Sequence, residues 1–165
     1  MKIAYITLSC AYNYGAVLQT YATYRFLHDL GHDVKLIDYT ADRYQIDRPD
    51  FVYRYTERWK KNFAFRALWR LTRYRMARRQ REHFRAFLLA HTPMTRAYFS
   101  NDELRQNPPE ADVFLTGSDQ IWNTDFSIDA KPELPYFLDF LPEKTSRIAY
   151  ASSFGKPALR EEEFS

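Results

Sequence analysis

The first forty residues contain the feature that most restricts the fold, a strand, a helix and a second strand in immediate succession. Residues 2–8 (KIAYITL) mix Ile, Ala, Tyr and Leu without a turn residue, as buried parallel strands do. Residues 33–39 (DVKLIDY) are typical of a second strand. Because two strands joined by one helix in the same sheet form a right-handed parallel crossover, the sequence predicts a parallel α/β fold.

The helix between these strands is predicted over residues 16–30. Gly31 follows it, at the position where a left-handed C-cap residue belongs. The four glycines of the chain, Gly15, Gly31, Gly117 and Gly155, all stand at predicted element ends. The helix is predicted to pack on the sheet through an apolar arc made of Val17, Leu18, Tyr21, Tyr24, Leu27 and Leu30.

The rest of the chain continues this pattern, so that its 165 residues are predicted to form one Rossmann-like domain. Residues 40–56 look irregular, whereas residues 57–90 lack Pro and Gly and should be largely helical, with a break near Thr72 or Gln80. Further elements are expected as a short helix at 101–106, strands at 111–116 and 147–152, and a short extended piece at 136–140.

Positive charge is concentrated in the predicted long helix. Residues 57–87 contain eleven Lys or Arg and only two acidic residues, whereas the whole chain has 24 basic and 21 acidic residues. A solvated helix face is the ordinary interpretation. The aromatic residues in the segment also favour contact with an anionic membrane surface. A stripe of charge that binds nucleic acid is the third interpretation, although no specific nucleic acid is expected. These aromatic residues are Trp59, Phe63, Phe65, Trp69 and Tyr74.

Several classes of protein are disfavoured by simple counts. The single cysteine, Cys10, can form neither an internal disulfide nor a cysteine-rich zinc site, and the four histidines lack metal-ligand spacing. We therefore expect no metal, and histidines on the surface. No stretch resembles a signal peptide or approaches the ~20 apolar residues of a membrane span. These features predict a cytoplasmic protein, with peripheral contact to the inner face of the plasma membrane as a further option.

Ligands of parallel sheets bind beyond the carboxyl ends of the strands, so the loops at these ends are the candidate sites. In the first loop (9–15), Asn13 either caps the following helix or belongs to an anion site at the helix N-terminus. The second loop, GSDQIWN (117–123), has polar groups and an indole that suit sugar recognition; the alternative is an Asx turn anchored by Trp122. In the third loop, Ser153 lacks the surroundings of a nucleophilic serine.

Two other functions compete with sugar recognition. Asp38 ends the second strand 23 residues after Gly15, near the spacing of a ribose-binding acid in a dinucleotide-binding enzyme, but the first loop lacks the glycine fingerprint. A non-catalytic module could instead dock on membrane or nucleic acid through its basic helix.

The ordered set of motifs resembles the polysaccharide pyruvyl transferase family over essentially the whole chain. The motifs are NYGAVLQ (13–19), IDY (37–39), Phe84 and Phe87, GSDQIWN (117–123), YFL (136–138) and IAYASSFG (148–155). The resemblance implies a two-domain enzyme similar to GT-B glycosyltransferases, with phosphoenolpyruvate as donor and a glycan or lipid-linked sugar as acceptor. It also implies that this chain is the N-terminal half, that the C-terminal domain is absent, and that the half alone is inactive.

The resemblance further implies roles for residues of the loops. Asp119 is expected as catalytic base or as the group that orients the acceptor, with no cofactor besides the donor substrate. The other residues expected to bind substrate or shape the cleft are Asn13, Tyr14, Gly15, Gln19, Ser118, Gln120, Trp122, Asn123 and Ser153. Residues 156–165 end in an acidic, helix-like sequence where a doubly wound sheet would normally continue, which also favours a piece of a longer enzyme.

Overall fold

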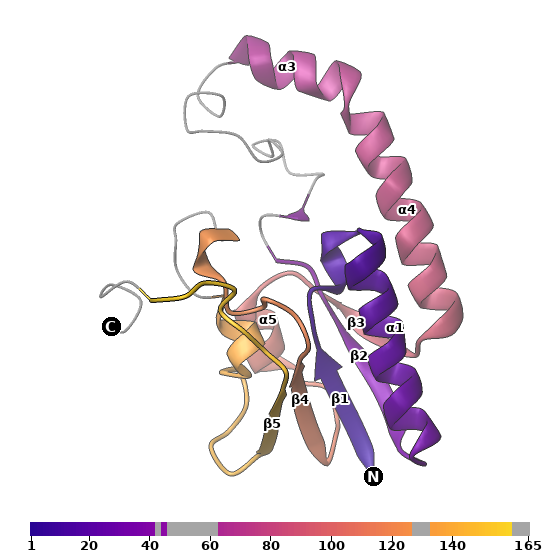
Figure 1. The fold of residues 1–165 in the computed structure, drawn as a ribbon, viewed down its shortest axis with the longest axis vertical. Helices are drawn as coiled ribbons and strands as arrows, with labels where there is room; N and C mark the ends of the chain where they lie inside the picture. Colours follow the sequence, from indigo (N-terminus) through magenta and orange to yellow (C-terminus); the bar gives the residue numbers. More distant parts are fainter. Residues whose placement is uncertain (42–43, 46–62, 127–132, 160–165) are drawn as a thin grey trace.

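The computed structural model describes residues 1–41, 44–45, 63–126 and 133–159, which contain a five-stranded parallel sheet with helices on its faces (Figure 1). The strand order is β3-β2-β1-β4-β5, which matches the first five strands of the Rossmann order 3-2-1-4-5-6, so the predicted parallel α/β class is confirmed. The strands are β1 (Lys2–Ile6), β2 (Asp33–Tyr39), β3 (Met94–Tyr98), β4 (Val113–Gly117) and β5 (Ser146–Tyr150).

The helices follow the predicted order. They are α1 (Tyr14–Asp29), α3 (Phe63–Thr72), α4 (Tyr74–His91) and α5 (Asn101–Gln106), with short 3-10 turns η1 (Ser9–Ala11), η3 (Thr124–Phe126) and η4 (Leu134–Phe137). The long basic segment is helical from Phe63 and breaks at Arg73, as expected near Thr72, whereas Gln80 lies inside an unbroken α4. The predictions for residues 42–43, 46–62 and 160–165, which include the start of the basic segment and most of the acidic tail, lie outside the described residues.

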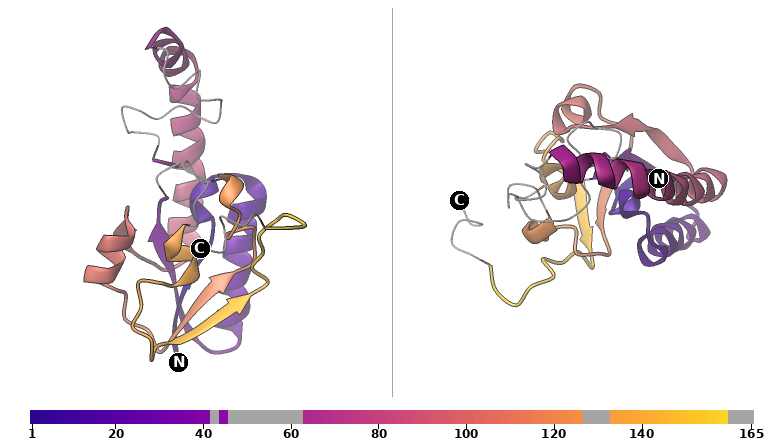
Figure 2. Two further views of the ribbon diagram at one scale, coloured as in Figure 1. Left: turned by 90° about the vertical axis from the view of Figure 1, so that its left-hand side faces the viewer. Right: turned by 90° about the horizontal axis from the view of Figure 1, so that it is seen from above.

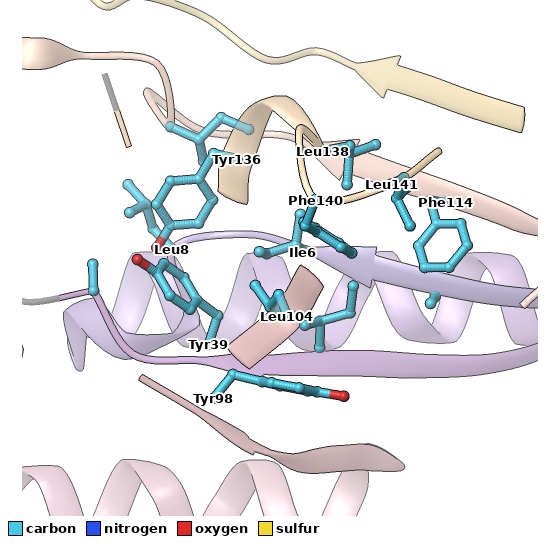
Figure 3. Close-up of a cluster of buried hydrophobic side chains, with 14 residues drawn as sticks. Ile6, Leu8, Tyr39, Tyr98, Leu104, Phe114, Tyr136, Leu138, Phe140 and Leu141 are labelled. Carbon is cyan, nitrogen blue, oxygen red and sulfur yellow. The ribbon is translucent and has the colours of Figure 1, made fainter. Parts of the chain in front are cut away.

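Alternation along β1 creates a separate core on each face of the sheet. Ile3 and Tyr5 pack on one face with Tyr24 and Leu27 of α1. The next residues along, Ala4 and Ile6, belong to a larger cluster on the other face, which α5 and η4 cover (Figure 3). A central strand buried on both faces needs apolar residues at every position, which explains the continuous KIAYITL run.

The predicted apolar arc of α1 is only partly correct. Ala16, Val17 and Thr20 are the buried residues of this helix, whereas Leu18 and Leu30 are 56% and 59% exposed. Gly31 has φ +86° and ends the helix as predicted. Spacing identified the side of the helix that faces the sheet, but it overestimated the width of that side.

The extended piece predicted at 136–140 is wrong, because η4 occupies its first part and Leu138 is left-handed (φ 59°). Pro135 lies in the first turn of η4. The carbonyl oxygen of Tyr136 accepts hydrogen bonds from Thr116 Oγ1 (2.7 Å) and Trp122 Nε1 (3.0 Å). This carbonyl therefore bonds to side chains of other segments. Strand β3, in contrast, was not anticipated; it pairs with β2 at one edge of the sheet.

Strand β5 forms the other edge and is exposed along its whole length, including Ile148 and Tyr150. It pairs in parallel with β4 from Ser146 to Tyr150. Among the described residues, no helix combines the length and the apolarity that crossing a bilayer would require.

Candidate functional site

The strand order places the first two candidate loops side by side. β1 pairs with β2 on one side and with β4 on the other, and all three strands are parallel. The chain therefore leaves β1 toward one side of the sheet, while β4 lies on the other side. In open α/β sheets, the ligand crevice lies at such a switch point, beyond the carboxyl ends of the strands. The loops after β1 and β4 lie on either side of this switch point.

The first loop turns through Tyr12, which is left-handed (φ 45°). Asn13 is the N-cap of α1, since its Oδ1 accepts a hydrogen bond from the backbone N–H of Ala16 (2.9 Å). Gly15 lies within the first turn of α1 and does not have a positive φ. The capping reading of Asn13 is thus confirmed. Its side chain and that of Tyr14 are nevertheless exposed at the rim.

Helix α4 holds Tyr12 in place. Gln80 Nε2 donates to the Tyr12 carbonyl oxygen (3.1 Å), and the Arg81 guanidinium lies 5.8 Å from the centre of the Tyr12 ring. Burial raises the pKa of the Tyr12 hydroxyl, although Arg81 and Arg85 act in the opposite direction. The long basic segment therefore braces the first loop, a role that its charge pattern did not reveal.

Asp38, considered above as a ribose-binding acid, is paired inside the protein. Arg85 Nη1 and Nη2 donate to its two carboxylate oxygens at 3.0 and 2.6 Å. The Asp38 side chain is only 6% exposed, and its hydrogen bonds raise the pKa of Arg85. Because this carboxylate is buried and committed to Arg85, the dinucleotide-binding reading loses the residue on which it rested.

The second and third loops are joined backbone to backbone. Ser118 N–H donates to the Tyr150 carbonyl (2.7 Å), Ser153 N–H to the Asp119 carbonyl (3.0 Å), and Trp122 N–H to the Ser153 carbonyl (3.2 Å). Ser118 (φ 57°) and Ala151 (φ 49°) are both left-handed non-glycine residues. Such conformations are costly and often occur at functional sites.

Gly117 makes this junction possible, because a Cβ there would lie well under 3.0 Å from the Tyr150 carbonyl oxygen. Gly155 has φ +66°, and a Cβ on it would collide with the side chain of Gln120. Gly117 and Gly155 are therefore needed because two chain segments approach closely at each of them, in addition to their places at the ends of predicted elements.

Trp122 and Asn123 have clear structural roles. The Trp122 ring stacks on Phe137 (5.3 Å between centroids, 18°) and contacts Phe154 (5.4 Å). Asn123 is 7% exposed; its Oδ1 accepts from Asp125 N–H (3.0 Å) and its Nδ2 donates to Gln120 Oε1 (3.2 Å). The structure thus shows the anchored Asx-type turn that was one of the two readings of this loop. A contact of either residue with sugar stays a prediction.

Tyr136 connects the first loop with the second. Its carbonyl oxygen binds Thr116 and Trp122, as described above, and its hydroxyl lies 3.7 Å from Cys10 Sγ. Cys10 is buried in this contact. The three loops therefore lie along one rim, as predicted: the second and third are bonded directly, and the first is joined to them through Tyr136.

The remaining predicted residues differ in how much of their side chains is engaged. Gln19 accepts from Thr7 Oγ1 (3.2 Å) and donates to Thr23 Oγ1 (3.1 Å), so its amide serves the packing of α1. Asp119 is half-buried and uses Oδ1 to accept from Gln120 N–H (2.7 Å). Gln120 and Ser153 are exposed, and Ser118 is half-buried. The rim thus presents a carboxylate, hydroxyls and amides, a set that can pair with both donors and acceptors of sugar hydroxyls.

Lys156 is a residue of the site that sequence reasoning missed. Its side chain is 11% exposed, and Nζ donates to Thr124 Oγ1 (2.7 Å) and to Asp125 Oδ1 (3.2 Å). It therefore fixes the segment after the third loop to the end of the second. The sequence offered one signal, the position of this lysine directly after Gly155.

Comparisons with known proteins agree with the motif pattern. A family model described as polysaccharide pyruvyl transferase matches residues 13–163. Searches of curated proteins and of solved structures found no match.

Proposed function

The chain belongs to the polysaccharide pyruvyl transferase family, and on this premise we propose that it supplies one wall of a site that transfers pyruvate from phosphoenolpyruvate to hydroxyls of a glycan. The observation that carries the proposal is the convergence of the loops after β1 and β4 at the switch point of a parallel sheet. The polar groups of the rim suit the acceptor, a sugar chain or a lipid-linked sugar.

The proposed reaction begins with protonation of the methylene carbon of phosphoenolpyruvate, which leaves the adjacent carbon cationic. A sugar hydroxyl attacks that carbon and gives up its proton, and phosphate leaves. A second hydroxyl then closes a ketal. The overall exchange converts phosphoenolpyruvate and two hydroxyls into a pyruvyl ketal and inorganic phosphate. It needs an acid for the methylene group and a base for the hydroxyls.

We assign the base, or the orientation of the acceptor hydroxyl, to Asp119. Its half-buried carboxylate lies in the loop after β4, and the hydrogen bond from Gln120 N–H to Oδ1 orients it. Asn13, Gln120 and Ser153, which the structure leaves exposed on the same rim, are the proposed acceptor contacts. Tyr14 would border the opening from the first turn of α1, where it is 78% exposed.

The donor is proposed to bind mainly to a second, GT-B-like domain that faces this rim. Both arginines that the structure places behind the first loop are engaged in bracing it, Arg85 with Asp38 and Arg81 with Tyr12. Phosphoenolpyruvate carries a phosphate and a carboxylate, which need several cationic donors. In this proposal the chain alone is inactive, and the reaction belongs to the cytoplasm.

The substitution Asp119→Asn tests the role assigned to Asp119. It is made in a two-domain enzyme in which this chain forms the N-terminal domain. Asparagine keeps an oxygen that can accept from Gln120 N–H, so the loop should keep its shape. We expect acceptor-dependent release of phosphate from phosphoenolpyruvate to fall by about 100-fold or more. Asp29→Asn is the matched control, since Asp29 pairs with Arg25 at the far end of α1. Unchanged turnover in the Asp119 variant would remove the proposed role.

A further inference from the structure

The segment formed by α3 and the first half of α4, residues 63–82, extends beyond the carboxyl-end rim of the sheet and is called the arm below (Figure 2). It contains seven arginines and one acidic residue, Glu82. Arg78 pairs with Glu82, and Arg73, Arg75 and Arg79 are exposed. The arm is therefore a strongly cationic projection.

The same arm exposes large aliphatic side chains. Leu68, Leu71 and Met76 are 56%, 81% and 61% exposed. Met76 also lines a groove of about 530 Å³ between α1 and α4, together with Leu18 and Tyr14, which are themselves exposed. Apolar surface thus continues from α3 toward the first turns of α1. Exposed apolar side chains gathered in one region usually mark an interaction surface.

The combination of charge and aliphatic side chains selects among partners. A nucleic acid would bind the arginines through its phosphates. Single strands also stack their bases on aromatic rings, and duplexes bind cations along the backbone. Neither form makes contacts that would require the exposed aliphatic side chains of Leu68, Leu71 and Met76. An anionic bilayer uses both, because arginines bind the headgroups while leucine and methionine enter the acyl boundary. We propose that the arm docks on the surface of an anionic lipid bilayer.

Docking would also orient the rim. The Gln80 hydrogen bond to the Tyr12 carbonyl ties the arm to the first loop, so a docked arm holds that loop close to the lipid surface. A lipid-linked acceptor would then meet the rim where it emerges from the membrane. Only this last consequence rests on the proposed pyruvyl transfer; binding to lipid does not depend on it.

The test is co-sedimentation of the 165-residue chain with phosphatidylcholine vesicles, with and without phosphatidylglycerol. We expect binding only to the anionic vesicles, and weaker binding as salt increases. The variants L68Q/L71Q/M76Q and R75Q/R79Q should each bind at least about tenfold more weakly. Matched controls remove the same kinds of group elsewhere: L30Q/L89Q at exposed leucines near the far ends of α1 and α4, and K35Q/K144Q at exposed lysines. Both controls should bind like the original chain.

Three results would overturn the proposal. The chain could fail to bind anionic vesicles, or the controls could lose as much binding as the arm variants. Duplex DNA could also bind as tightly as the vesicles and stay insensitive to L68Q/L71Q/M76Q, which would identify a nucleic acid as the partner. Circular dichroism checks that each variant is folded. If the triple variant is unfolded, the single variant L71Q replaces it, because Leu71 is the most exposed of the three residues. Pyruvyl transfer is measured separately, so its absence leaves the lipid result interpretable.

Discussion

At the residue scale, the shape of the rim depends on a few positions where the backbone of one loop touches another. Gly117 allows the ends of β4 and β5 to approach each other. The left-handed residues Ser118 and Ala151 follow directly, where each segment leaves its strand. The N–H groups and carbonyls beyond the strands pair across the two loops. Asp119 is thereby held between backbone partners, which gives its carboxylate a defined position.

Gly117→Ala should therefore destabilise the protein by about 2–4 kcal/mol, because the new methyl group meets a backbone carbonyl that cannot rotate away. Gly15→Ala is the control. A Cβ there would lie 3.4 Å from Asn13 Oδ1, an ordinary contact, so the free energy of unfolding should stay unchanged or rise by up to about 1 kcal/mol. Urea unfolding compares the two variants. Equal stability of both would contradict the packing described at the end of β4.

At the element scale, α4 is attached to the sheet through Arg85 and Asp38. The pair lies beside β2, on the face of the sheet that α1 covers, and α1 contacts α4 through Tyr14–Phe84 and Tyr21–Phe87 ring pairs. The Asp38 carboxylate is nearly buried, so removal of its partner leaves a charge without compensation. This ion pair is therefore the buried charged contact among those that attach the helix and hold the first loop.

Arg85→Met should lower the free energy of unfolding by about 3 kcal/mol, at the lower end for a buried pair because Arg85 itself is 30% exposed. Arg78→Met removes an arginine from an exposed pair with Glu82 in the same helix, and should cost less than about 1 kcal/mol. Thermal unfolding of both variants gives the comparison. If Arg78→Met were the more damaging change, the ion pair with Asp38 would not contribute to the stability of the protein as described.

At the scale of the whole molecule, the described residues form a sheet that is covered unevenly. Within the sheet, nearly all of the buried residues belong to β1, β2 and β4, whereas every residue of β5 is exposed. In Figure 1, α4 lies on the side of the sheet away from β5, and α3 continues from it beyond the rim. Local stability should follow this coverage, because backbone hydrogen bonds near solvent open more readily.

Hydrogen exchange should therefore rank the strands. We expect the backbone amides of β1 to exchange most slowly and those of β5 to exchange at least about tenfold faster. The amides of α3 should exchange fastest of the three elements. The comparison is internal to one sample, so it needs no variant. Equal protection of β5 and β1 would mean that another chain covers this edge in solution, which the molecular mass would then reveal.

The sequence determined the strand, helix, strand order, the end of α1 at Gly31 and the polar loops after β1, β4 and β5, because these depend on local propensity and on alternation of apolar residues. Its motifs also identified the family. It did not identify β3, η4 or the left-handed Tyr12, since their conformations depend on partners far along the chain.

Tertiary structure decided which groups of the loops remain for a ligand. The Asp38 carboxylate was assigned to Arg85, 47 residues away, and Trp122 to the carbonyl of Tyr136. Composition lists the polar groups of a loop, but hydrogen bonding in the folded chain satisfies some of them internally and leaves others at the surface. Only the packed sheet, which brings distant segments to one rim, could separate the two kinds.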